Sequence, residues 1–211
     1  MSAIWDWLTK GYLRLADPIA DRLVARGVRP NTITTIGLVC TLAAGAIFAS
    51  GRISIGGWVL GLTAVFDVLD GTVGRRSGRE TAFGAFYDST LDRIADGAVL
   101  GGLTIFWASG SDRHSLMMVI VCLFAIIGAY LTSYTRARAE GLGLDARVGL
   151  MQRPERVVLL SAPQAFFGLA FDGLVLKFIV VLLAVTSWIT VAQRMAYVRR
   201  ATLSNPKSPS Q

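Results

Sequence analysis

Four aspartates lie close together in the sequence, between two long apolar segments. Asp67 and Asp70 are three residues apart, and Asp88 and Asp92 are four residues apart. On a helix, both spacings place the two side chains on one face. Carboxylate oxygens suit hard cations such as Mg²⁺ and Mn²⁺, and two such ions ~3.5–4 Å apart suit phosphoryl transfer. The pattern therefore predicts that these four aspartates bind two divalent metal ions.

The stretch between the two pairs is rich in glycine and must reverse the direction of the chain. Its glycines are Gly71, Gly74, Gly78 and Gly84. We expect the flanking helices to be antiparallel neighbours whose carboxylates converge. The alternative is that the aspartates only pair with nearby arginines, but ion pairing does not require the glycines. Asp96, one turn beyond Asp92, is assigned to helix packing or to support of the metal ligands.

The composition predicts that this chemistry takes place in a membrane. Of the 211 residues, 53% are hydrophobic and 17% are charged, and the mean hydropathy is +0.54. Soluble domains have about 25% charged residues. The net charge of +7 could indicate nucleic acid, but the basic residues cluster in short gaps between apolar runs. We expect no nucleic-acid binding, because a surface of anionic membrane lipids is the better partner.

Apolar runs predict an all-α integral membrane protein. A helix needs about 20 apolar residues to cross the bilayer, and Pro163 makes the fifth of six candidates the weakest. A single domain of residues 1–200 would contain an amphipathic interfacial helix within residues 1–28 and six spans within 31–196. Residues 201–211 are expected to form a disordered tail. The six candidate spans are roughly 31–50, 54–73, 86–109, 113–137, 155–171 and 174–196.

The basic residues predict the orientation of these spans. Seventeen of the 21 Lys and Arg residues flank one side of the membrane, and only Arg52, Arg113 and Lys177 flank the other. Lys and Arg collect on the cytoplasmic side of membrane proteins. We therefore expect a multi-pass protein of the cell membrane, with both termini and the aspartates at the cytoplasmic side.

The spacing of the aspartates resembles the signature of the CDP-alcohol phosphotransferase family, D-x2-D-G-x2-A-R-x8-G-x3-D-x3-D. The stretch from Asp67 to Asp92 matches every aspartate, both glycines and the arginine of this pattern. Gly74 stands where the family has alanine, a loss of one methyl group. Enzymes of this family transfer a phosphate-linked group from a CDP-lipid to a hydroxyl and expel CMP. The resemblance implies an enzyme that uses CDP-diacylglycerol, and the family is commonly homodimeric.

The resemblance also implies roles for individual residues. Asp67, Asp70, Asp88 and Asp92 would hold two Mg²⁺ or Mn²⁺ ions, and Asp92 would also be the general base for the attacking hydroxyl. A helix start near Pro30 favours anions, glycines let a nucleotide approach the backbone, and an arginine can bind phosphate with two hydrogen bonds. The implied contacts of CDP-diacylglycerol are Pro30, Asn31, Thr32, Ile33, Gly71, Arg75, Thr81 and Gly84.

A second basic cluster predicts an acceptor that carries phosphate. The segments "SYTRARAEG" and "MQRPER" and the last span place arginines at three span ends on the side of the aspartates. Membrane orientation alone also explains any single arginine. A phosphorylated alcohol needs such a cluster, whereas inositol or serine does not. These segments most resemble the phosphatidylinositol phosphate synthases of actinobacteria. The resemblance implies inositol phosphate as acceptor, bound by Ser133, Arg136, Arg153, Arg156 and Arg194.

Three other functions stay open. Glycerol 3-phosphate, the acceptor of phosphatidylglycerol phosphate synthases, is also an anion. An intramembrane prenyltransferase would hold Mg-pyrophosphate with two Asp-rich motifs, but its first motif usually carries Asn-Asp and a further Asp that this chain lacks. A metal-ion transporter would place its carboxylates near the bilayer midplane and would have no use for Arg75 or the glycine-rich hairpin.

Overall fold

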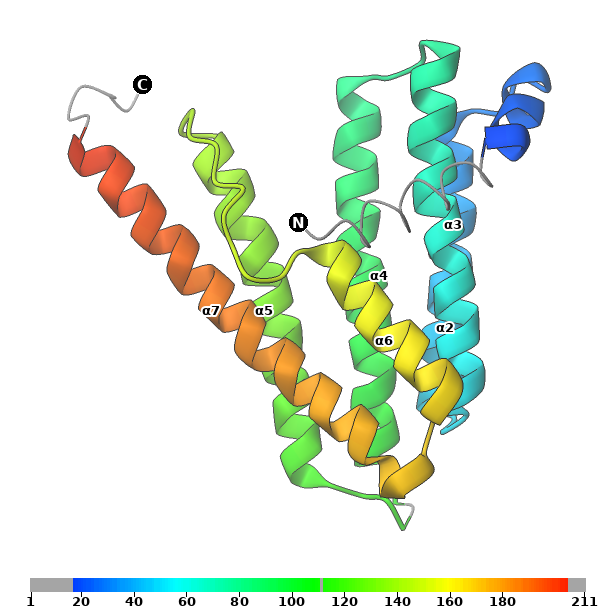
Figure 1. The fold of residues 1–211 in the computed structure, drawn as a ribbon, viewed down its shortest axis with the longest axis vertical. Helices are drawn as coiled ribbons and strands as arrows, with labels where there is room; N and C mark the ends of the chain where they lie inside the picture. The colour runs from blue at the N-terminus through cyan, green and yellow to red at the C-terminus, as the bar shows by residue number, and fades with distance from the viewer. Residues whose placement is uncertain (1–16, 111, 205–211) are drawn as a thin grey trace.

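The computed structural model describes residues 17–110 and 112–204, and all regular structure in these ranges is helical. Residues 17–25 form a short helical segment that precedes the long helices (Figure 1). The elements that follow are α2 (Pro30–Ala49), α3 (Ile53–Ser77), α4 (Ala82–Ala108), α5 (Leu116–Glu140), α6 (Arg153–Phe167), the 3₁₀ helix η1 (Ala170–Gly173) and α7 (Leu174–Ser204).

Four helices of the described chain are long and apolar enough to cross a bilayer, namely α2, α3, α5 and the segment from η1 through α7. The prediction of an all-helical membrane protein is confirmed at this level. Two of the six predicted spans differ from the other four. α4 has 27 residues but carries Asp88, Asp92, Arg93 and Asp96 in its first half. α6 has only 15 residues, fewer than the about 20 that a span needs.

The ends of the chain differ from the predicted domain boundaries. α7 continues to Ser204, so residues 201–204 are helical and not part of a disordered tail. Residues 205–211, and residues 1–16 of the predicted interfacial helix, lie outside the described residues. The helical segment 17–25 is held by the buried Ala20 and by ion pairs of Arg76 with Asp17 and Asp21.

α2 packs against both α3 and α4, and this arrangement sets the spacing of the aspartates. α3 and α4 run antiparallel, as predicted, but each packs more extensively on α2 than on the other (Figure 1). α6 packs on α3, α5 packs on α4, and α7 packs on α5. α3 ends at Ser77 and is followed by Gly78, which has the left-handed φ of 64° that glycine adopts without strain.

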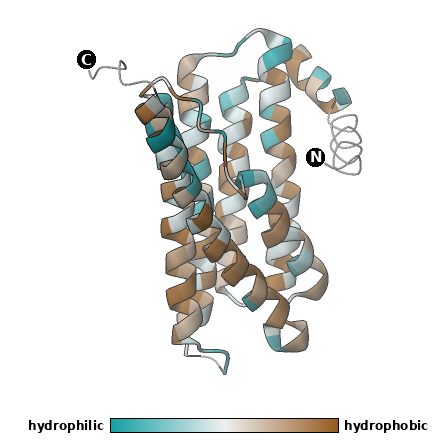
Figure 2. Ribbon diagram, turned by 60° about the vertical axis from the view of Figure 1, so that its left-hand side comes forward, coloured by the Kyte–Doolittle hydropathy of each residue, from teal (hydrophilic) through white to brown (hydrophobic). Residues whose placement is uncertain are grey.

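Small residues let these helices approach closely, as is common in membrane proteins. A methyl group on Gly102 of α4 would lie 2.1 Å from the carbonyl oxygen of Gly45 in α2. A methyl group on Gly57 of α3 would lie 2.4 Å from the backbone nitrogen of Ala165 in α6. Figure 2 shows hydrophobic residues along most of the helices, with hydrophilic residues near the α3–α4 turn and at the start of α6. The α3–α4 turn and the start of α6 therefore lie at the same, polar end of the helix bundle.

Candidate active site

The two pairs of aspartates lie on α3 and α4, near the polar end of the bundle. Asp67 and Asp70 lie in the last turns of α3, and Asp88 and Asp92 lie in the first turns of α4. Asp70 is buried, and the hydroxyl of Thr34 in α2 donates a 2.7 Å hydrogen bond to its carboxylate. α2 thus contributes directly to the aspartate site.

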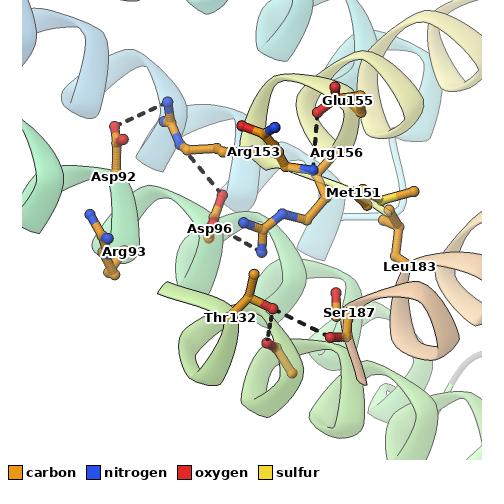
Figure 3. Close-up of polar contacts among 12 residues, drawn as sticks. Asp92, Arg93, Asp96, Thr132, Met151, Arg153, Glu155, Arg156, Leu183 and Ser187 are labelled. Carbon is orange, nitrogen blue, oxygen red and sulfur yellow. Dashed lines mark hydrogen bonds and ion pairs between the residues drawn. The ribbon is translucent and has the colours of Figure 1, made fainter. Parts of the chain in front are cut away.

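The guanidinium of Arg153, at the start of α6, lies between carboxylates of both pairs. Its Nη1 is 2.7 Å from Asp67 Oδ2 and 3.0 Å from Asp92 Oδ1. Its Nε is 3.7 Å from Asp96 Oδ1, and Arg156 Nη1 is 3.3 Å from the other oxygen of Asp96. Figure 3 shows Asp92, Arg153, Asp96 and Arg156 linked in this order. Two arginines from α6 are therefore held against α4 by carboxylates.

The sequence pattern predicted that all four carboxylates converge on one point, but in the structure they do not. Within the described ranges, no three metal-ligating side chains are gathered closely enough to hold an ion, because Arg153 lies between Asp67 and Asp92. Asp70 and Asp88 form no ion pair with any described residue. The chemistry of the set still fits a hard divalent cation, since its donors are all carboxylate oxygens and negative charge remains uncompensated.

A cavity of about 410 Å³ opens between α2, α3 and the start of α4. We call it the glycine cavity, because Gly71, Gly74 and Gly84 line it together with Asp70 and Asp88. Five of the eight predicted nucleotide contacts face this cavity. They are Pro30, Asn31, Gly71, Thr81 and Gly84.

The other three predicted nucleotide contacts do not line the glycine cavity. Ile33 is 3% exposed and packs in the core beside Leu69 and Val73. Thr32 is exposed on α2. Arg75 is exposed on α3, where its Nη2 lies 3.4 Å from the Thr72 hydroxyl. Helical periodicity explains the difference, because residues 30, 31 and 34 share one face of α2 and residue 33 points toward α3.

Three polar side chains of the cavity were not predicted from the sequence. Thr34, Arg79 and Glu80 also line the glycine cavity. Thr34 lies four residues after Pro30, so the helical repeat of the predicted segment was a signal that could have found it. Arg79 and Glu80 lie in the turn after α3, where no spacing rule indicates which side chains point inward.

A second cavity of about 640 Å³ lies between α4, α5, α6 and α7. We call it the arginine cavity. All five predicted acceptor contacts line it, and so does Arg93, to which the sequence analysis assigned no role. The predicted contacts are Ser133, Arg136, Arg153, Arg156 and Arg194.

Most arginines of this cavity are held by partners of the protein itself. Arg194 is 3% exposed, and it donates hydrogen bonds to the backbone carbonyls of Val148, at 2.9 Å, and Thr132. Arg136 forms an ion pair with Glu140 at 2.9 Å. These contacts fix the guanidinium groups before any anion arrives, which favours binding of a phosphate of matching geometry.

Ala85 and Asp88 line both cavities. The two cavities therefore meet beside the aspartates of α4, and Asp92 lies on the side of the arginine cavity. A group bound in the glycine cavity and an anion bound in the arginine cavity would meet next to Asp88. This arrangement suits transfer of a group between two bound molecules.

The fold and this pair of cavities define a membrane enzyme with two substrates, and the comparisons place it in a family. The model of the CDP-alcohol phosphatidyltransferase family matches residues 27–196. The chain therefore belongs to the CDP-alcohol phosphatidyltransferase family, and the resemblance noted in the sequence is confirmed.

Individual relatives are similar to this chain over most of their length. The chain is 39% identical over 189 residues to the phosphatidylinositol phosphate synthase of Mycobacteroides abscessus, covering 89% of this chain and 85% of that protein. It is 37% identical over 185 residues to the archaetidylinositol phosphate synthase of Methanothermobacter thermautotrophicus, covering 88% and 89%.

The fold is similar to that of the phosphatidylinositol phosphate synthase of Mycobacterium tuberculosis. The structure of that protein with CDP-DAG bound has a TM-score of 0.82 and 33% identity, covering 94% of this chain and 98% of that chain. Its structure in complex with manganese and citrate has a TM-score of 0.80 and 34% identity, covering 93% and 92%.

Proposed function

We propose that this chain transfers the phosphatidyl group of CDP-diacylglycerol to a hydroxyl of inositol phosphate, giving phosphatidylinositol phosphate and CMP. The observation that carries the proposal is the meeting of two chemically different cavities at Asp88. The glycine cavity offers backbone and small polar side chains to a nucleotide. The arginine cavity offers guanidinium groups to a phosphate. The relatives' names support the acceptor, because phosphatidylinositol and archaetidylinositol phosphate synthases differ in their lipid and share inositol phosphate.

The residues divide the reaction between them. The acceptor's hydroxyl oxygen forms a bond to the lipid-linked phosphorus, and the bond from that phosphorus to the CMP oxygen breaks. The carboxylate of Asp92 takes the hydroxyl proton, since it lines the arginine cavity beside Asp88. The acceptor's phosphate is held by the five predicted contacts of the arginine cavity, Ser133, Arg136, Arg153, Arg156 and Arg194. The glycine cavity holds the leaving CMP.

Asp67, Asp70, Asp88 and Asp92 would hold two divalent ions, Mg²⁺ or Mn²⁺. Such ions supply positive charge to the pyrophosphate as the bond to CMP breaks. The manganese complex of the Mycobacterium tuberculosis protein supports a divalent cation.

The proposed setting is a homodimer in the cell membrane, formed by a single domain that ends with α7 at Ser204. We propose that α4 and α6 also span the bilayer, giving six spans after an interfacial helix within residues 1–28. Both termini and the active site would face the cytoplasm. This arrangement is supported by the Lys and Arg residues near the polar end of the helices.

The test is an acceptor panel with the purified protein in lipid vesicles and radiolabelled CDP-diacylglycerol. We expect product with inositol phosphate, little with free inositol or serine, and CMP release that depends on the acceptor. Preference for glycerol 3-phosphate would transfer the assignment to phosphatidylglycerol phosphate synthesis. Preference for free inositol would contradict the role given to the arginine cavity.

A further inference from the structure

Asp96 lies outside the family's aspartate pattern but contacts two arginines of the acceptor site. It is one turn beyond Asp92 on α4, and its side chain is 12% exposed. Its two oxygens lie 3.7 Å from Arg153 Nε and 3.3 Å from Arg156 Nη1. One carboxylate therefore faces two guanidinium groups that come from the first turn of α6 (Figure 3).

The start of α6 is built so that these two arginines point together. The backbone nitrogen of Gln152 donates a 3.1 Å hydrogen bond to the Glu155 carboxylate, and the Gln152 side chain caps the helix in return. Arg153 and Arg156 are three residues apart, so they lie on one face of α6. Arg156 is 5% exposed and has no other carboxylate partner among the described residues. Asp96 is thus its counter-charge.

Arg153 is shared between Asp96 and the metal-ligand carboxylates. Its Nη1 contacts Asp67 and Asp92, and its Nε faces Asp96. A guanidinium between Asp67 and Asp92 competes with a divalent cation for the same oxygens. Arg153 is thus attracted by Asp67 and Asp92 on one side and by Asp96 on the other. The relative strength of these attractions determines how strongly Arg153 competes with a metal ion, and how readily its guanidinium binds an anion in the arginine cavity.

We propose that Asp96 is a positioning residue that holds Arg153 and Arg156 toward the acceptor's phosphate and weakens the hold of Arg153 on Asp67 and Asp92. The acceptor part of this inference rests on the proposed function, whereas the metal part does not. Asp96 lines the arginine cavity, but a carboxylate repels the acceptor's phosphate. It acts through the two arginines, as a counter-charge that they can keep when a metal ion takes Asp67 and Asp92.

The first experiment separates the two substrates. Asp96→Asn keeps the shape of the side chain and removes its charge. We expect the KM for inositol phosphate to rise about 10-fold, since two charge-assisted contacts lose their alignment. The KM for CDP-diacylglycerol should stay unchanged, and Asp96→Glu should restore part of the acceptor affinity. Asp145→Asn is the matched control, because Asp145 is exposed and its one ion pair among the described residues is with the exposed Arg147.

The second experiment measures Mn²⁺ binding by electron paramagnetic resonance, without substrates. Asp96→Asn should weaken Mn²⁺ binding several-fold, because Arg153 then has only Asp67 and Asp92 as partners. Arg153→Gln should tighten Mn²⁺ binding. In the Arg153→Gln background, Asp96→Asn should have a much smaller effect. Losing the charge of Asp96 also weakens Mn²⁺ binding directly, and this effect is present in both backgrounds. The difference between the two backgrounds therefore measures the effect that acts through Arg153.

The outcomes separate this inference from the proposed function. An equal loss of Mn²⁺ affinity in both backgrounds, or an unchanged inositol phosphate KM in Asp96→Asn, would overturn the positioning role. Equal increases in both KM values would show a general structural role and also overturn it. A wild type that prefers another phosphorylated acceptor refutes only the proposed function, because the Mn²⁺ cycle is read without any acceptor. Elution as one peak in size-exclusion chromatography shows that each variant is folded.

Discussion

The two cavities contain different kinds of chemistry. The glycine cavity is lined by backbone and small side chains from α2, α3 and the start of α4, and Gly71, Thr81 and Gly84 leave it open. The arginine cavity is lined by long cationic side chains from four helices. The first accommodates a ligand by leaving space. The second offers a ligand positive charge that the protein has already arranged and partly neutralised.

This difference predicts how each cavity responds to change. In the glycine cavity, added volume should be harmful, and lost contacts should matter less. In the arginine cavity, Arg136 pairs with Glu140 and Arg156 with Asp96, so lost charge should disturb partners as well as ligand. Asp88 belongs to both cavities, and its loss should affect both substrates at once.

The largest effect is therefore expected for Asp88→Asn. This change removes a charged oxygen donor where the cavities meet, and transfer should fall by at least about 10³-fold. The measurements are turnover with saturating substrates and Mn²⁺ affinity, with Asp145→Asn as the control. Near-normal turnover would show that Asp88 has no role in the reaction, although it lines both cavities. It would then contradict the idea that transfer takes place where the cavities meet.

A pair of variants should separate the cavities with intermediate effects. Gly84→Val fills the glycine cavity, where even a methyl group would lie 3.1 Å from the Thr81 hydroxyl. Overpacking of about 1–3 kcal/mol corresponds to a rise of about 5- to 150-fold in the KM for CDP-diacylglycerol. Arg194→Gln should raise the KM for inositol phosphate by a similar factor, about 10- to 100-fold, through loss of a charged contact.

Each of these variants should leave the other substrate's KM unchanged. Arg199→Gln is the matched control for Arg194→Gln, because Arg199 is exposed on the same helix and lines neither cavity. If Gly84→Val changed mainly the acceptor's KM, or Arg194→Gln mainly the donor's, the two cavities would have to exchange their ligands.

The smallest effect is expected for Gly74→Ala, which restores the alanine of the family pattern. The new methyl group would lie 3.5 Å from Glu80 and 3.7 Å from Pro30, both ordinary contacts. Alanine is favoured over glycine within a helix by about 1 kcal/mol, so thermal unfolding in detergent should shift upward. Gly102→Ala is the opposite control, because its methyl group would meet the Gly45 carbonyl. A destabilised Gly74→Ala would show that the glycine cavity has less room than described.

Five of the eight predicted nucleotide contacts line the glycine cavity, and three of them, Gly71, Thr81 and Gly84, are close in the chain. The aspartate and glycine spacing placed Gly71, Gly84 and Asp88 without knowledge of the fold. Ile33, predicted as a nucleotide contact, does not line the cavity, because consecutive residues of a helix cannot all share one face. The sequence analysis also did not predict that α2 packs against both α3 and α4 and reaches Asp70 through Thr34. That contact joins residues 36 positions apart, and no local pattern contains it.

The arginine cavity was harder to predict because every arginine there has a second explanation. Arg153, Arg156 and Arg194 stand at span ends, where membrane orientation also requires positive charge. Their common cavity depends on how α6 and α7 pack, and the apolar pattern does not specify this packing. The contact of Arg153 with Asp67 joins residues 86 positions apart. The sequence therefore singled out residues that the structure brings into one cavity, but not that Asp96 links two of them.

If α6 spans the bilayer as proposed, it is shorter than the bilayer around it. Its 15 residues extend about 22 Å at 1.5 Å per residue, against about 30 Å for the hydrocarbon core. If η1 lies level with the far interface, Arg153 lies roughly 8 Å below the near one. Lipids must then thin beside α6, or water must follow the arginines inward. Such a mismatch makes the depth of the reaction depend on the thickness of the host membrane, so turnover should vary with the acyl-chain length of the surrounding lipids.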